Sequence, residues 1–515
     1  MKRTLKDYGA LTPAERTLRD EVGSGLVVVI GDGTLPDADA GEDRQIRASF
    51  LRYLALGGCD KCRPSEKGLE IAGAVIISDG SARAETPGFD LEACQIDGDL
   101  GLFNCHFPDA PLLRGTRVGS LYLNGSRFEN GIQADRLTAK GGAFLRDVTA
   151  KGEVRLLGAS LGESFDCNGA NFEAVADAHG RMGPAFSADR LSAKGGAFLS
   201  GITAKGEVRL PGASVDGVLD CDGARFEGGG FNLDSLKIGG GIFLRDLEKI
   251  SDTLDLTNAK AGALADSPKS WPAPGQLKLD RFRYGAILGD DAPVNAPSRL
   301  DWLSRMPIDL EKGQFSPQPY EQLAQVLRDM GHPRDARKVL ERKEQYQRQA
   351  GIGQLPSGSL RRPLRRAWNW ILRWTVGYGH YPLRAGIWLI GLWAFGAIVY
   401  RDAYITGDFK PNSAFVLRAD EWADCRDNGA YAGQLRCFEA RPEAAGYPRF
   451  NAAVYSADVL LPVVALEMQE YWVPDSSKST RGVLTRWFLW LQILAGWALT
   501  LLAVAGFSGI VKSDR

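Results

Sequence analysis

One block of this sequence occurs twice. Residues 135–145 (DRLTAKGGAFL) return as 189–199 (DRLSAKGGAFL), and 149–156 (TAKGEVRL) return unchanged as 203–210. The start positions 135 and 189 lie 54 residues apart, and a shorter third copy begins at Asp234. Internal repetition on this scale is typical of proteins built from stacked structural repeats.

A finer period lies inside the block, where small or apolar residues come in pairs two positions apart and successive pairs start five or six residues apart. The pairs are Leu137/Ala139, Gly142/Phe144, Val148/Ala150, Val154/Leu156, Ala159/Leu161, Phe165/Cys167 and Ala170/Phe172. Positions two apart in an extended chain point the same way, so each pair predicts a short strand with one inward face. Four such strands give a coil of roughly 20 residues, and stacked coils give a β-solenoid.

Similar pairs begin at Leu69/Ile71 and continue to Leu264, which predicts a mainly β domain over 68–264. Four cysteines fall in inward positions, where a free thiol packs as a small apolar group. They are Cys94, Cys105, Cys167 and Cys221. Residues 175–184 interrupt the first copy, and this excursion, which carries His179, is the most plausible decorated loop.

Residues 170–174 (ANFEA) and 224–228 (ARFEG) resemble the repeat of the pentapeptide-repeat proteins. This resemblance implies a right-handed quadrilateral β-helix. Some members of that family mimic DNA through an acidic surface, but basic residues such as Lys140, Lys151 and Arg155 argue against mimicry here.

The whole chain resembles a group of bacterial membrane proteins that join a degenerate pentapeptide solenoid to a C-terminal membrane anchor. The stretches that carry this resemblance are 11–16 (LTPAER), 152–156 (GEVRL), 319–323 (PYEQL) and 474–477 (PDSS). Members of this group are sometimes labelled membrane-associated oxidoreductases.

The segments around the solenoid have distinct compositions. Residues 1–67 predict an N-terminal helical cap, with one helix opening at Thr12 and a second over 45–56. Three prolines within 266–274 favour a connector over 265–317, because proline interrupts both ladders and helices. Residues 318–350 predict a helical hairpin, with Gly331 ending the first helix and Pro333 opening the second.

Residues 361–515 predict a membrane domain. Arg361, Arg362, Arg365, Arg366 and Arg373 alternate with tryptophans, which favours an interfacial helix on an anionic leaflet. Segments 381–400 and 487–511 are long and apolar enough to span a bilayer. Basic residues precede the first segment and follow the second, so both of these ends are expected on the cytoplasmic side. We therefore expect a multi-pass protein of the inner (cell) membrane with cytoplasmic N- and C-termini.

The segment 401–486 would then lie outside the cytoplasm, where oxidation is permitted, and we expect Cys425 and Cys437 within it to form a disulfide. Residues 1–8 lack the apolar core of a secretory signal, which agrees with a cytoplasmic N-terminal part.

Two stretches suggest a channel. Residues 375–379 (TVGYG) spell a potassium selectivity filter, but no span precedes them, so we interpret them as a bend before the first span. The apolar run 451–466 is short for a span and predicts a re-entrant helix or an amphipathic helix lying on the membrane. Asp458, Glu467 and Glu470 are the pore candidates of the first alternative.

Two short motifs bear on enzymatic activity. Residues 26–33 (LVVVIGDG) look like the start of a dinucleotide loop, but the third glycine position is occupied by Pro36, so we expect a strand and turn. Cys59 and Cys62 form one CxxC motif, which is compatible with a redox pair or half a zinc site. We therefore expect no cofactor or metal.

Three functions remain open: a non-enzymatic membrane-anchored scaffold for a protein partner, a homo-oligomeric pore, and an oxidoreductase using the CxxC pair. The 62 basic and 63 acidic residues balance, so we expect no nucleic-acid partner.

Overall fold

The computed structural model describes residues 4–78, 88–176, 180, 182–356, 358–375, 377–379, 383–426 and 433–507. It divides into two compact units, each described here by itself. The first unit comprises Met1–Leu310 with Gln314–Lys343, and the second comprises Glu311–Gly313 with Glu344–Arg515.

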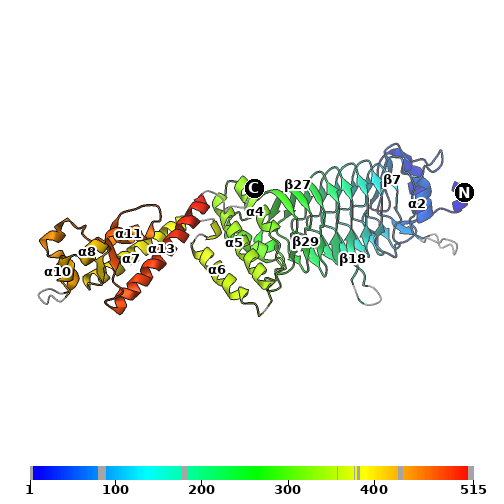
Figure 1. Ribbon diagram of the computed structural model, residues 1–515. Helices are drawn as coiled ribbons and strands as arrows, with labels where there is room; N and C mark the ends of the chain where they lie inside the picture. The colour runs from blue at the N-terminus through cyan, green and yellow to red at the C-terminus, as the bar shows by residue number, and fades with distance from the viewer. Residues whose placement is uncertain are drawn as a thin grey trace. The chain divides into compact units, whose positions relative to one another are not determined.

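The first unit is a parallel β-solenoid of about 8 turns (Figure 1). Its strands stack in four parallel ladders that run along the solenoid. Three long strands continue from ladder 4 into ladder 1 and join them into one 16-stranded sheet; they are β27 (Lys237–Leu244), β30 (Lys260–Asp266) and β32 (Arg283–Ile287).

The remaining strands are short. Ladder 1 contains β1 (Val28–Val29), β3 (Gly68–Ala72), β5 (Asp99–Phe103), β8 (Leu121–Tyr122), β12 (Ala143–Phe144), β16 (Phe165–Asp166), β20 (Ala197–Phe198) and β24 (Leu219–Asp220). Ladder 2 contains β2 (Gln45–Arg47), β4 (Val75–Ile77), β6 (His106–Phe107), β9 (Arg127–Phe128), β13 (Thr149–Lys151), β17 (Asn171–Glu173), β21 (Thr203–Lys205), β25 (Arg225–Glu227) and β28 (Lys249–Ile250). Ladder 3 contains β10 (Ile132–Gln133), β14 (Val154–Arg155), β18 (Pro184–Ser187), β22 (Glu207–Arg209), β26 (Phe231–Asn232), β29 (Leu254–Asp255) and β31 (Leu277–Lys278). Ladder 4 contains β7 (Arg117–Val118), β11 (Thr138–Ala139), β15 (Ser160–Leu161), β19 (Ser192–Ala193) and β23 (Ser214–Val215).

One coil of the duplicated block contains 22 residues, the sequence separation between Lys151 on β13 and its partner Glu129 in the preceding coil. The separation rises to 32 residues between Lys205 and Glu173, because the predicted excursion at 175–184 falls in that coil. The 54-residue duplication therefore corresponds to two coils plus this excursion. Residues 177–179 and 181, including His179, lie outside the described part of the chain.

The interior of the solenoid is filled by the inward residue pairs, and all the predicted pairs in the duplicated block are buried except one. At Gly142/Phe144 the prediction is wrong by one position: Ala143 and Leu145 point inward, and Phe144 stacks outside on Tyr122 at 4.9 Å between ring centres. The error arises because two glycines precede Ala143. Both possible inward registers therefore begin with a small residue, and the pattern of every second residue does not distinguish them.

Three of the four cysteines predicted to be inward, Cys105, Cys167 and Cys221, are buried. Cys94 is only half-buried and lies 3.6 Å from an Arg52 nitrogen, so its core assignment is wrong. Residues 91–95 form a turn in the first coils, where the strand pairing is not yet regular.

The N-terminal end is covered by α1 (Pro13–Glu21) and α2 (Ala48–Ala55), with 3-10 turns η1 (Leu5–Tyr8) and η2 (Val22–Ser24). Thr12 and Glu15 form a capping box at α1. Glu15 is fully buried and also pairs with Arg47 at 2.6 Å, which ties α1 to β2. The helix predicted over 45–56 begins only at Ala48, because Gln45–Arg47 pair as a strand with β4.

At the C-terminal end the solenoid extends beyond the predicted limit at Leu264, because β31 and β32 add strands to ladders 3, 4 and 1. The proline-rich stretch is an excursion within this coil, with the 3-10 turn η3 (Pro268–Ser270), and not the start of a separate connector. Helices α3 (Ala296–Ser304) and α4 (Gln318–Asp329) follow, and Gln322 on α4 donates to the Tyr284 carbonyl of β32 at 2.7 Å.

The predicted helical hairpin is formed by α4 and α5 (Pro333–Gly353), and α5 continues into the second unit. That unit is mainly helical. Its elements are α6 (Arg361–Thr375), η4 (Gly377–Gly379), α7 (Leu383–Ile405), β33 (Phe409–Pro411), α8 (Ala414–Arg418), α9 (Asp420–Ala423), α10 (Gln434–Glu439), η5 (Pro442–Gly446), α11 (Ala452–Leu460), α12 (Met468–Tyr471), β34 (Trp472–Pro474) and α13 (Thr480–Phe507).

The expectation of a β-solenoid is confirmed, while the helices make the chain as a whole 35% helix and 22% strand. Most solenoid strands contain only two or three residues, and the corners between them are turns. The helices of the second unit contribute most of the helical residues. The handedness of the coil stays a prediction.

Candidate functional site

The outward face of ladder 3 carries a regular series of polar side chains. On each strand the inward residue is apolar, as in Val154 of β14, and the next residue points out. The outward series along the solenoid is Gln133, Arg155, Ser187, Arg209, Asn232, Asp255 and Lys278. A flat ladder of parallel strands thus presents one polar side chain per coil.

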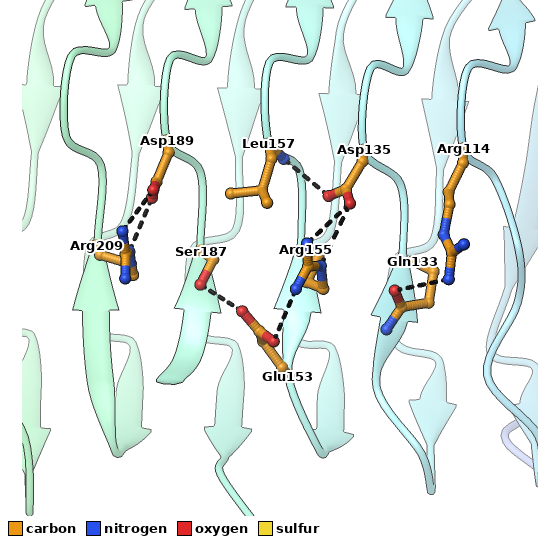
Figure 2. Close-up of polar contacts among 9 residues, drawn as sticks. All are labelled: Arg114, Gln133, Asp135, Glu153, Arg155, Leu157, Ser187, Asp189 and Arg209. Carbon is orange, nitrogen blue, oxygen red and sulfur yellow. Dashed lines mark hydrogen bonds and ion pairs between the residues drawn. The ribbon is translucent and has the colours of Figure 1, made fainter. Parts of the chain in front are cut away.

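Within this face the two copies of the repeat form the same ion pair (Figure 2). Arg155 contacts the Asp135 carboxylate at 3.0 Å, and Arg209 contacts that of Asp189 at 2.5 Å with a second bond at 2.9 Å. In each pair the hydrogen bond to the aspartate raises the pKa of the arginine. Half-buried pairs of this kind hold successive coils in register more than they add to stability.

A third contact extends the Arg155–Asp135 pair across the coil that carries the excursion, while the Arg209–Asp189 pair stands apart from it (Figure 2). Glu153 accepts a hydrogen bond from the buried Ser187 hydroxyl at 2.6 Å and lies 3.4 Å from Arg155. Asp135 also accepts from the Leu157 backbone N–H at 3.2 Å. The side chains of Asp135, Glu153 and Arg155 therefore hold one another in position.

The same face contains a polar cleft of about 310 Å³ beside the 175–184 excursion. Met182 of the excursion, Glu207, Asp255 and Lys278 are among the residues that line it. Lys278 contacts Asp255 at 3.0 Å. Hydrogen bonds from Thr257 and Lys278 outweigh burial and lower the pKa of Asp255, so this carboxylate is charged at neutral pH.

The described residues contain no group of three or more His, Cys, Asp or Glu side chains arranged to hold a metal ion. Cys59 and Cys62 lie in a turn after α2 with their Cα atoms 5.0 Å apart, close enough for a disulfide. Cys62 is buried and Cys59 is half-buried. Among the core thiols, burial raises the pKa of Cys105 to about 12 and those of Cys167 and Cys221 well above their ordinary value, which makes them unreactive.

In the second unit the described residues contain one helical segment, Thr480–Val504 of α13, that is long and apolar enough to cross a membrane. Two such spans were expected. Charged residues at Arg384, Arg401 and Asp402 restrict the uncharged part of α7 to 385–400, which is shorter than the about 20 residues of a typical span. Residues 381–382 and 508–511, which belong to the predicted spans, lie outside the described part.

The helix α6 contains all five arginines predicted to lie at the membrane interface, and none of its side chains is buried. Its arginines and its apolar residues lie on opposite sides of the helix. The exposed apolar residues are Leu364, Trp368, Trp370, Ile371 and Trp374. The Trp388 indole of α7 donates to the Trp374 carbonyl at 3.1 Å and links the two helices. The TVGYG stretch between them ends in η4, and its Val376 lies outside the described residues.

Helices α7, α11 and α13 pack closely around a buried polar group. The Gln492 side chain of α13 accepts from the Tyr400 hydroxyl at 2.6 Å and donates to Ser456 of α11 at 3.0 Å. Ser456 in turn donates to the Trp393 carbonyl at 2.8 Å. All three side chains of this network are fully buried. A Cβ at Gly396 would collide with Ser456 and Gln492, so glycine is required for this approach.

The apolar run predicted over 451–466 contains the helix α11 only as far as Leu460, followed by an irregular turn that leads to α12. Of the three pore candidates, Asp458 is buried and accepts hydrogen bonds from the Leu466 and Gln469 backbone N–H groups at 2.7 and 2.8 Å. Glu467 and Glu470 are exposed. Asp458 therefore holds the turn against α11.

Cys425 and Cys437 lie with their Cα atoms 5.5 Å apart and their sulfur atoms at bonding distance. Both side chains are buried next to an aromatic cluster that includes Trp422 and Phe438. The geometry suits the disulfide expected for this segment.

No protein-family model, curated protein or solved structure matches the chain. The likeness to pentapeptide-repeat proteins and to membrane-associated bacterial proteins therefore stays a resemblance of short motifs.

The Tyr400–Ser456–Gln492 network and the cleft beside Met182 were not predicted from the sequence. A glutamine inside the otherwise apolar α13 was the available signal for the network, since polar residues in such helices usually bond to a neighbouring helix. The cleft had no signal, because its lining residues come from coils that only stacking brings together.

Proposed function

We propose that this chain is a non-enzymatic scaffold, anchored in the cell membrane, that presents the outward face of ladder 3 to a protein partner. The observation that carries the proposal is the recurrence of the same ordered ion pair on this face, Arg155 with Asp135 and Arg209 with Asp189. A surface whose side chains are already ordered loses little conformational entropy when a partner binds.

The second unit supplies the anchor in this proposal. We infer that α13 crosses the bilayer. Although the uncharged part of α7 is short for a span, we infer that α7 crosses beside α13, because Tyr400 bonds to Gln492 of α13 and many apolar side chains of α7 are exposed. The in-plane α6 places its tryptophans among the acyl chains and its arginines at the phosphates. This arrangement gives a multi-pass protein with both termini in the cytoplasm, where the solenoid lies.

The assignment of the solenoid to the right-handed quadrilateral type belongs to this proposal too. Its support is the presence of four ladders with 22-residue coils and the five-residue motifs at 170–174 and 224–228.

A charge-reversal experiment tests the partner surface. The full chain with Arg155→Glu and Arg209→Glu is cross-linked in cells, purified in detergent and compared quantitatively with the unmodified chain. The matched control is Lys151→Glu with Lys205→Glu, which alters two repeat-related lysines on ladder 2 that pair with Glu129 and Glu173.

A partner recovered in stoichiometric amount with the unmodified chain and the control, but lost with the ladder 3 variant, is the expected result. Equal recovery from both variants would assign binding to another surface, and the absence of any stoichiometric partner would refute the scaffold.

A further inference from the structure

The strongest unexplained feature of the second unit is the turn at 461–467 that follows α11. Helix α11 lies against both α7 and α13, with Ser456 bonded to Gln492 near the middle of the apolar segment Thr480–Val504. A Cβ at Gly496 would collide with the Leu460 carbonyl, so α11 ends beyond that middle point. If α13 crosses the bilayer as proposed above, the turn lies at the depth of the hydrocarbon.

This turn is poorly suited to contact with lipid. Val463 is 85% exposed, and the structure records no hydrogen bond within the described part of the chain for the backbone N–H groups of Val463, Val464 and Ala465. Irregular backbone at membrane depth is tolerated only where protein covers it or water reaches it. The exposed backbone therefore requires one of these two environments.

The charge beside the turn leads to the same conclusion. Glu467 is exposed and occupies the left-handed region at φ 63°. Ionisable side chains inside a membrane face the interior of a bundle or a water-filled space, because a charge in hydrocarbon is costly. Asp458, in contrast, is buried and hydrogen-bonded, so it needs no further environment.

The apolar side chains of the turn can face lipid, whereas its amides and Glu467 need water or protein. Copies of the chain arranged around a common axis meet this need, since neighbouring turns shield one another's backbone from lipid and leave water on the axis. A ring of carboxylates on that axis favours cations.

We propose that several copies of this chain assemble with their 461–467 turns around a water-filled path, in which Glu467 faces the water and attracts small cations. This proposal rests on the membrane anchoring proposed above. It adds an ion-conducting function to the scaffold.

The first test is thiol accessibility in liposomes that contain the full chain. Val463→Cys is treated with a charged, membrane-impermeant thiol reagent, and labelling is measured at that site by peptide mass spectrometry. Ser476→Cys, at an exposed position before α13, is the water-exposed control, and Leu494→Cys, at a 70% exposed position on α13, is the lipid control.

We expect Val463→Cys to react nearly as fast as Ser476→Cys and to form cross-linked pairs on oxidation, while Leu494→Cys stays unlabelled. Protection of Val463→Cys at the level of Leu494→Cys, or the absence of cross-linked pairs, would overturn the assembly. Fast labelling of Leu494→Cys would show instead that α13 does not cross the bilayer, so the two failures are distinguishable.

The second test is potassium flux from the same liposomes. Glu467→Gln removes the charge that concentrates cations and should lower the flux about tenfold. Glu443→Gln, which removes an exposed carboxylate in η5, is the matched control and should leave the flux unchanged. No flux from the unmodified chain, or equal flux from both variants, would refute the conducting path.

Discussion

The buried ion pair at the C-terminal end of the solenoid offers a direct test of how this end is closed. Arg299 of α3 is 0% exposed and forms two bonds to Asp266 of β30, at 2.8 and 2.7 Å. The Trp271 indole also donates to Asp266 at 2.8 Å, and Arg299 donates to the Pro293 carbonyl at 2.6 Å. The guanidinium lies 5.4 Å from the Trp302 ring centre.

Asp266→Ala removes the only carboxylate that the structure records in contact with this guanidinium among the described residues. An uncompensated buried charge costs about 3–5 kcal/mol. The unpaired Trp271 N–H adds about 1–3 kcal/mol if water cannot reach it. We therefore expect the free energy of local unfolding around β30 and α3 to fall by at least about 3 kcal/mol.

The double variant Asp266→Leu with Arg299→Met replaces the ion pair by apolar side chains of similar size. Such replacements are often nearly neutral, so the double variant should lose much less than the single one. Hydrogen exchange of β30, β32 and α3 measures the local opening free energy without assuming that the whole repeat protein unfolds at once. A loss below about 1 kcal/mol for Asp266→Ala, or a double variant as unstable as the single one, would refute the reasoning.

Three further predictions concern other parts of the chain. Burial lowers the pKa of His106 below 6.5 despite the attraction of Glu129, so the stability that neutral His106 gives β6 should be fully present above pH 6.5 and lost as the pH falls through the lowered pKa. Hydrogen exchange of β6 between about pH 7.5 and about pH 5.5 should show this loss, and His106→Gln should abolish the pH dependence. Gly396→Val should separate α7 from α11 and cost about 1–3 kcal/mol of thermal stability in detergent, whereas Gly391→Val, at a position with open space, should cost little; equal effects would contradict the packing. Cys425 and Cys437 should resist thiol labelling in the unreduced native protein, and replacing both by serine should cost about 2–4 kcal/mol; labelling of both thiols would disprove the disulfide.

The solenoid could be predicted because its information is local. Each inward pair, such as Val154/Leu156, lies within one short strand, and the same spacing recurs in every coil. Prediction fails where the local pattern is degenerate, as at Gly142/Phe144, where two successive glycines leave the register open. It also fails at the C-terminal end, where the prolines of 266–274 suggest an interruption although the ladder continues on both sides.

The candidate sites depend on contacts that composition and spacing do not encode. Arg155 and Asp135 are 20 residues apart and meet only because one coil stacks on the next. Gln492 and Tyr400 are 92 residues apart and meet through helix packing. Asp458 was predicted as a pore candidate because it is an isolated charge in an apolar run. Its role in holding the turn is shown only by the hydrogen bonds that it accepts from two backbone N–H groups.

The 22-residue coil has a consequence for how the length of this protein can change. Each coil adds one strand to every ladder, and neighbouring strands lie about 4.8 Å apart, so gain or loss of one coil alters the reach of the solenoid by that distance. Because the duplicated unit holds a whole number of coils, such a change leaves every inward position and every Arg–Asp pair in register. The length of the solenoid can therefore be set, by evolution or by a designer, in steps of one strand spacing.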